Sequence, residues 1–82
     1  MVEVHWADKF KETFSKIKEP LLKSRIFKQI EKIIQNPEVG KPMRNVRKGT
    51  RELYIKPFRL SYSYIKSEDK IILLDFYHKD KQ

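Results

Sequence analysis

The segment Lys41–Arg59, KPMRNVRKGTRELYIKPFR, decides how this chain is organised. It holds seven of the 19 Lys and Arg residues, a single acid, Glu52, and one of the 2 glycines. Arg51–Lys56 alternates apolar and polar residues as strands do, Arg44–Arg47 is a candidate short strand, and residues 48–50 predict a turn. We expect helical support before this basic segment, and a strand pair after it that completes a sheet.

The residues before this segment predict one strand and two helices. Val2–Trp6 alternates like a short strand, and Asp8–Lys18 has helical periodicity, with Asp8 as the expected N-cap. A second helix is expected from Pro20 to about Asn36, because Pro suits a first helical turn and Pro37 ends the pattern. The apolar stripes of the two helices are Phe10, Phe14, Ile17 and Leu22, Ile26, Ile30, Ile33, Ile34. Joined by a tight turn, they form an antiparallel hairpin whose apolar face needs a sheet.

The residues after it predict two antiparallel strands, Phe58–Ile65 and Ile71–Tyr77, joined by a turn at Lys66–Lys70. The expected pairs are Phe58–His78, Arg59–Tyr77, Leu60–Phe76, Ser61–Asp75, Tyr62–Leu74, Ser63–Leu73 and Tyr64–Ile72. This register keeps aromatic and aliphatic residues on one face, whereas a shift by one residue would put Asp75 in the apolar layer.

The predicted fold is therefore a single α+β domain, residues 1–82. An N-terminal strand precedes an antiparallel helical hairpin, which packs on one face of a twisted, mostly antiparallel sheet of four to five strands. The other face is expected to be open. It bears Arg59, Ser61, Asp75 and Tyr77, with Asp75 as its only plausible carboxylate.

Composition narrows the class of protein. The chain has 82 residues, no cysteine and two distant histidines, so we expect no metal site, no cofactor and a core built by apolar packing alone. No apolar run approaches the roughly 20 residues that span a bilayer, and the N-terminus does not resemble a signal peptide, so we expect a cytoplasmic protein. The net charge of +8 favours a polyanionic partner, although it also suits a merely soluble surface.

The residue types on the open face suit cleavage of RNA without a metal. In that reaction the 2′-OH attacks the adjacent phosphorus, cations stabilise the phosphorane, and side chains move protons. The expected catalytic residues are Arg59, His78, Lys79, Tyr77 and Lys56, and the expected RNA-binding residues are Arg51, Lys48, Arg47 and Arg44. Structural alternatives stay open, since Arg59 could pair with Asp75 and His78 could be a silent terminal residue.

Two motifs, Phe58-Arg59-Leu60-Ser61-Tyr62 and Phe76-Tyr77-His78-Lys79, follow the strand and the helical hairpin. The ordered set resembles the RelE/ParE superfamily of toxins from toxin–antitoxin modules, over nearly the whole chain. The resemblance implies a RelE-like fold, a toxin that cleaves mRNA on the ribosome, and an acidic, partly disordered RelB-like antitoxin. It implies catalytic roles for Arg59 and for Lys79 or His78. Glu52 and Tyr54 stand where many members have Arg or Lys, and no tyrosine follows Tyr77.

Three functions remain open at this point. The first is a ribosome-dependent mRNA endonuclease, with an inactive toxin as its variant. The second is a ParE-like inhibitor of DNA gyrase without nuclease chemistry. The third is a non-catalytic RNA- or ribosome-binding module, for which positive charge is enough.

Overall fold

The protein is described by a computed structural model that covers residues 2–43 and 49–78. Its elements are β1 (Glu3–Trp6), α1 (Asp8–Ser15), α2 (Pro20–Gln35), β2 (Lys41–Pro42), β3 (Arg51–Ile55), β4 (Phe58–Ile65), a 3₁₀ turn (Lys66–Glu68) and β5 (Lys70–His78). The strands form one sheet in the order β1-β5-β4-β3-β2, in which β1 runs parallel to β5 and the other pairs are antiparallel.

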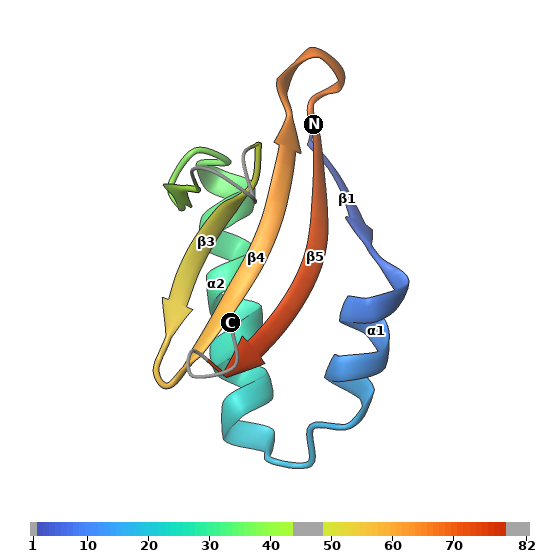
Figure 1. Ribbon diagram of the computed structural model, residues 1–82, viewed down its shortest axis with the longest axis vertical. Helices are drawn as coiled ribbons and strands as arrows, with labels where there is room; N and C mark the ends of the chain where they lie inside the picture. The colour runs from blue at the N-terminus through green and yellow to red at the C-terminus, as the bar shows by residue number, and fades with distance from the viewer. Residues whose placement is uncertain (1, 44–48, 79–82) are drawn as a thin grey trace.

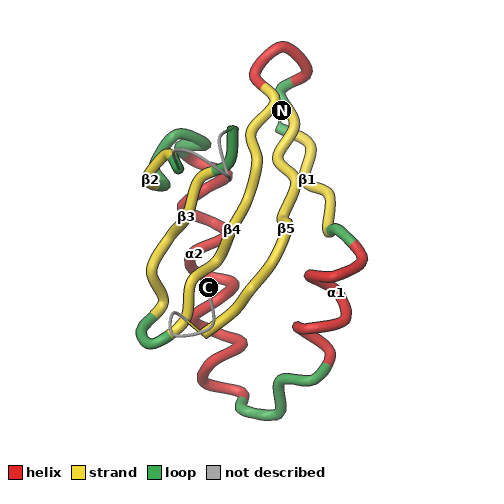
Figure 2. The backbone as a smooth tube through the Cα atoms, in the orientation of Figure 1, coloured by secondary structure: helices red, strands yellow, loops and turns green. Residues whose placement is uncertain are grey.

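The helices form the predicted antiparallel hairpin on one side of this sheet. Figure 1 shows α2 behind β3 and β4, and α1 beside the end of β5 that β1 does not reach. The tube in Figure 2 shows the two helices joined by one loop at the end of the molecule opposite the β4–β5 turn. The α+β outline expected from the sequence is thus confirmed, with five strands in the sheet.

The helix ends differ from prediction at α1. Ala7, not Asp8, occupies the N-cap position with extended backbone, and no side chain caps the helix. The reason is that the Ala7 N–H still donates to the Leu73 carbonyl (2.9 Å), which keeps this residue in line with the sheet. Asp8 becomes the first helical residue, where its charge favours the helix dipole. The helix ends at Ser15 rather than Lys18, whereas α2 begins at Pro20 as expected.

The core lies between the helices and the covered face of the sheet. Its buried residues are Phe10, Leu22, Ile26, Ile30, Ile33, Ile55, Leu60, Tyr62, Ile71, Leu73 and Phe76. Trp6 of β1 packs against the helical hairpin, with edge-to-face ring contacts to Phe10 (5.0 Å between centroids) and Phe14 (5.2 Å). The predicted stripes of both helices thus pack into or against the core, except Ile34, which is 41% exposed.

The predicted register between β4 and β5 is correct for the first four pairs and wrong by one residue for the others. The four predicted pairs from Phe58–His78 to Ser61–Asp75 are confirmed. Beyond them the ladder shifts by one residue, so Tyr62 pairs with Leu73 instead of Leu74 and the rest follow, with Ser63 opposite Ile72 and Tyr64 opposite Ile71. This irregularity buries Leu73 completely while Asp75 stays opposite Ser61, away from the apolar layer.

The basic segment is only partly described. The expected strand Arg44–Arg47 lies outside the described residues. Residues 41 and 42, for which the sequence indicated no strand, form the short edge strand β2 against Glu52 and Arg51. Gly49 occupies the predicted turn with φ of 95°, a backbone region that favours glycine.

Candidate functional site

A buried carboxylate lies on the face of the sheet away from the helices, here called the open face, where Glu52 and Ser61 are both buried. Strand alternation and register bring together Glu52 from β3, Arg59 from β4 and Tyr77 from β5, which we call the Glu52 cluster. Arg59 Nη1 donates to Glu52 Oε1 at 3.3 Å, and the Tyr77 hydroxyl donates to Glu52 Oε2. The Glu52 residue is only 6% exposed, so these two partners offset the cost of removing its charge from water.

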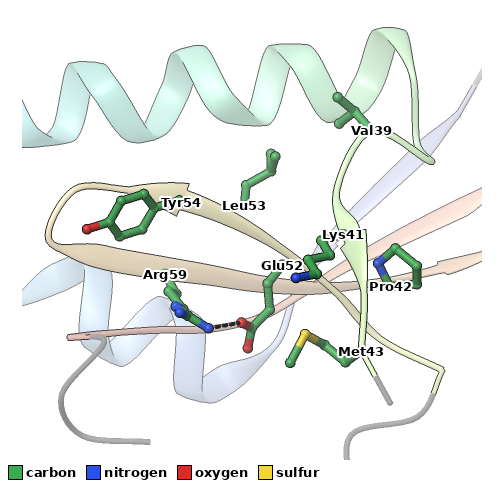
Figure 3. A pocket seen from close by; sticks show the side chains of 8 residues that line it. All are labelled: Val39, Lys41, Pro42, Met43, Glu52, Leu53, Tyr54 and Arg59. Atoms are coloured by element: carbon green, nitrogen blue, oxygen red, sulfur yellow. Dashed lines mark hydrogen bonds and ion pairs between the residues drawn. The ribbon is translucent and has the colours of Figure 1, made fainter.

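A cleft of about 980 Å³ opens beside this cluster. It is lined by Val39, Lys41, Pro42, Met43, Glu52, Leu53, Tyr54 and Arg59. Figure 3 shows Tyr54 toward one end, the Glu52–Arg59 ion pair in the middle, and Pro42 and Met43 toward the other end. A guanidinium and a carboxylate thus share a cleft that also has apolar walls.

The segment 37–43, which we call the strap, is fixed against the covered side of the sheet. The buried Tyr62 hydroxyl donates to the Pro37 carbonyl (2.8 Å) and accepts from the Gly40 N–H (2.9 Å). Arg51 Nη1 donates to the carbonyls of Glu38 (2.9 Å) and Gly40 (2.8 Å). A Cβ at Gly40 would lie 2.7 Å from the Tyr62 ring, so glycine allows this approach. The strap carries Lys41, Pro42 and Met43 to the cleft.

Burial in this contact raises the pKa of the Tyr62 hydroxyl above its ordinary value, although the hydrogen bond from Gly40 opposes that shift. The group therefore remains a neutral donor and acceptor at physiological pH.

The structure brings together two of the predicted catalytic residues. Arg59 and Tyr77 lie opposite each other on the open face, as the predicted register requires. The alternative pairing of Arg59 with Asp75 is wrong: Arg59 pairs with Glu52, and Asp75 pairs with Lys9 at 3.3 Å. The expectation that Asp75 is the only carboxylate on this face is also wrong, because Glu52 lies there as well.

The other described candidates do not join the cluster. His78 is the next residue after Tyr77 on β5, so it lies on the other face, where its ring meets Phe58 edge-on at 5.5 Å. Arg51 pairs in register with the buried Tyr62 and is engaged by the strap. Lys56 is exposed in the β3–β4 turn, where its carbonyl accepts from Arg25. The remaining candidates, Lys79, Lys48, Arg47 and Arg44, lie outside the described residues.

Sequence reasoning missed Glu52 and Tyr54 as site residues. Glu52 is the single acid among seven cations of the basic segment, and that contrast was the available signal.

Within residues 2–43 and 49–78, no group of His, Cys, Asp or Glu side chains could hold a metal ion. In the same residues, no helix has the length and apolar character needed to cross a bilayer.

Similarity to known proteins agrees with this architecture. The YoeB/ParE toxin from Agrobacterium tumefaciens superposes with a TM-score of 0.84 at 12% identity, over 94% of this chain and 98% of that one. The RelBE2 toxin–antitoxin complex from Mycobacterium tuberculosis contains a chain with a TM-score of 0.82 at 20% identity, over 95% and 98% of the two chains. The intact E. coli RelBE toxin–antitoxin complex contains a chain with a TM-score of 0.81 at 9% identity, over 95% of this chain and 96% of that one.

No curated protein sequence matches the chain. The sequence family described as the ParE toxin of the type II toxin–antitoxin system parDE matches residues 4–82. The chain therefore belongs to this ParE toxin family, within the RelE/ParE superfamily that its motifs resembled, and is the toxin of a toxin–antitoxin module.

Proposed function

We propose that this toxin is a metal-independent endoribonuclease that cleaves mRNA on the ribosome. The observation that carries the proposal is the Glu52 cluster, where a proton acceptor, a guanidinium and a hydroxyl converge on one open face. These are the three kinds of group that cleavage through the 2′-OH requires.

The chemistry of each side chain suggests its role in the proposed reaction. The Glu52 carboxylate takes the proton of the 2′-OH as that oxygen attacks the adjacent phosphorus. The Arg59 guanidinium stabilises the extra negative charge on the phosphorane oxygens. The P–O5′ bond then breaks, and the Tyr77 hydroxyl gives its proton to the leaving 5′-oxygen. The products are a 2′,3′-cyclic phosphate and a 5′-OH, and the Tyr77–Glu52 hydrogen bond returns the proton to Tyr77.

Three substitutions test this assignment. Glu52→Gln and Tyr77→Phe are each expected to lower the rate of mRNA cleavage on translating ribosomes by about 10²–10⁴-fold, the usual contribution of a general acid or base. Arg59→Ala is expected to lower it by about 10²–10³-fold through lost charge stabilisation. The matched control is His78→Ala, which removes a titratable side chain from the opposite face. Cleavage that survives in all three cluster variants, while they remain folded, would contradict the proposal.

A ParE-like inhibitor of DNA gyrase is the second candidate, and the family description favours it. In that case the Glu52–Arg59 pair would be structural. Inhibition of supercoiling by the purified toxin, without RNA cleavage on ribosomes, would select this function.

We also propose an acidic antitoxin as the partner. The similar toxins from E. coli and M. tuberculosis occur in complexes with antitoxins, and this chain carries a net charge of +8. An interface of complementary charge should weaken steeply with added salt. An affinity that does not change with salt would instead indicate a mainly apolar interface.

A further inference from the structure

Tyr54 presents a large aromatic side chain on the open face. It is 51% exposed, although most tyrosines and phenylalanines of the chain pack into or against the core. On strand β3 it pairs directly with Arg59 on β4, and both residues line the cleft. Directly opposed strand residues have Cβ atoms about 4.5–5.5 Å apart, so the aromatic ring and the guanidinium belong to the same local site.

The rest of the cleft suits a flat, partly apolar ligand. Val39, Pro42 and Met43 supply apolar walls, and Figure 3 places Pro42 and Met43 beyond the Glu52–Arg59 pair from Tyr54. The volume of about 980 Å³ lies in the range of roughly 300–1,000 Å³ typical of small-molecule sites. The charged pair therefore has apolar surface on both sides, which is the pattern that a phosphodiester flanked by bases requires.

We propose that Tyr54 is a stacking platform for a nucleobase of single-stranded RNA. The base belongs to a nucleotide next to the phosphodiester that Arg59 contacts. Stacking on an aromatic side chain tolerates every base, because each base has a π-face, and it fixes the position of the strand. This inference rests on the proposed function for the identity of the ligand, and it adds a positioning residue that the family resemblance did not supply.

The experiment compares Tyr54→Phe, Tyr54→Leu and Tyr54→Ala. Phe keeps the π-face, Leu keeps apolar bulk without it, and Ala removes both. The first readout is kcat/KM for cleavage on ribosomes. The second is the Kd of a short single-stranded RNA with a 2′-deoxy nucleotide at the cleaved position, which binds but cannot react. Ala and Leu should weaken both quantities by about 5- to 150-fold, and Phe should match the wild type.

An abasic scan separates stacking from a general structural effect. One nucleotide on either side of the cleaved bond is made abasic in turn. At one of the two positions, the abasic change should weaken binding of the RNA to the wild type and to Tyr54→Phe. It should change the affinity of Tyr54→Ala little, because that variant has already lost the stacking contact. The control variant is Leu21→Ala, which removes another exposed apolar side chain, 70% exposed on α2. It should bind and respond like the wild type.

The outcomes distinguish this inference from the proposed function. If the deoxy RNA binds with the expected Tyr54 dependence but no RNA is cleaved, the stacking platform stands and the nuclease function fails. If the wild type cleaves RNA and all three Tyr54 variants match it, the nuclease stands and the platform fails. Equal behaviour of Leu and Phe overturns the platform too, as does a wild type that binds no RNA. A loss of antitoxin affinity in Tyr54→Ala, with RNA binding unchanged, would assign the residue to a protein interface instead.

Discussion

The two faces of the sheet use the same kind of residue in opposite ways. On the covered side, Arg51 donates to two backbone carbonyls and braces the strap. On the open side, Arg59 pairs with a carboxylate at the edge of a cleft. Both arginines come from the same basic segment and lie on paired strands. The face of the sheet on which an arginine lies, and not the density of charge along the sequence, therefore decides whether its guanidinium braces the backbone or lines the cleft.

The largest effect should come from opening a void on the covered face. Leu60 is fully buried in the core, so Leu60→Ala is expected to lower the free energy of unfolding by about 2–5 kcal/mol. Urea unfolding followed by circular dichroism measures it. The exposed Leu21 provides the control, since Leu21→Ala should change stability by less than about 0.5 kcal/mol. Similar losses in both variants would mean that the covered face is not the core.

The next effect concerns the contact between the strap and the covered face. Gly40→Ala places a Cβ 2.7 Å from the buried Tyr62 ring, and this overpacking should cost about 1–3 kcal/mol. Thermal unfolding measures it, with Val39→Ala as the control at the adjacent, 40% exposed position. Unchanged stability in Gly40→Ala would show that the strap can move away from Tyr62, and the wall of the cleft would then not be fixed.

A pair of arginine variants tests the two faces directly. Arg51→Met should lower stability by about 1–2 kcal/mol through lost hydrogen bonds to the strap, and lower cleavage much less than Arg59→Met because Arg51 does not line the cleft. Arg59→Met should lower cleavage by about 10²–10³-fold, and it should also destabilise the fold because it removes the guanidinium that pairs with the buried Glu52. Adding Glu52→Gln to Arg59→Met should recover part of that stability but no activity. Equal loss of cleavage in both arginine variants would show that the faces are not functionally distinct.

The pairing of β4 with β5 could be predicted from the sequence in its first half only. Strict alternation from Phe58 to Tyr62 settles the first half of the ladder, and with it the pairing of Arg59 with Tyr77. The second half could not be predicted, because residues 71–74 read Ile-Ile-Leu-Leu and alternation cannot show which of four apolar residues is the extra one. The register shift after Ser61 allows Leu73 to be buried in the core. Asp75 remains opposite Ser61, outside the apolar layer.

The site was less predictable than the fold for a related reason. His78 follows Tyr77 in the sequence, but neighbours on a strand point to opposite faces, so closeness in sequence does not bring His78 to Arg59. Glu52 stands where many family members have Arg or Lys. The alternation of apolar and polar residues along β3 does not show what its carboxylate contacts. Its contacts with Arg59 and Tyr77 become visible only when three strands bring these residues together.

The smallest expected effect is a pH dependence that comes from the covered face alone. Burial raises the pKa of Tyr62, whereas a tyrosine in the unfolded chain ionises near about pH 10. Between these two values the unfolded state has lost its proton and the folded state has kept it. Stability from this group is therefore complete below about pH 10 and is lost as the pH rises toward the folded pKa.

Tyr62→Phe should thus have two signatures. At neutral pH it should cost about 1–2 kcal/mol, because the Gly40 N–H and the Pro37 carbonyl lose their partner. Above about pH 10 its stability should fall less steeply than that of the wild type, in urea unfolding repeated across the alkaline range. Tyr64→Phe is the companion variant, since desolvation and then the hydrogen bond to Asp69 also raise the pKa of Tyr64, and the double variant should show the flattest profile. Parallel profiles for Tyr62→Phe and the wild type would mean that the Tyr62 hydroxyl is not held by the strap, and the distinction between a covered face braced by the strap and an open face that bears the cleft would lose its structural basis.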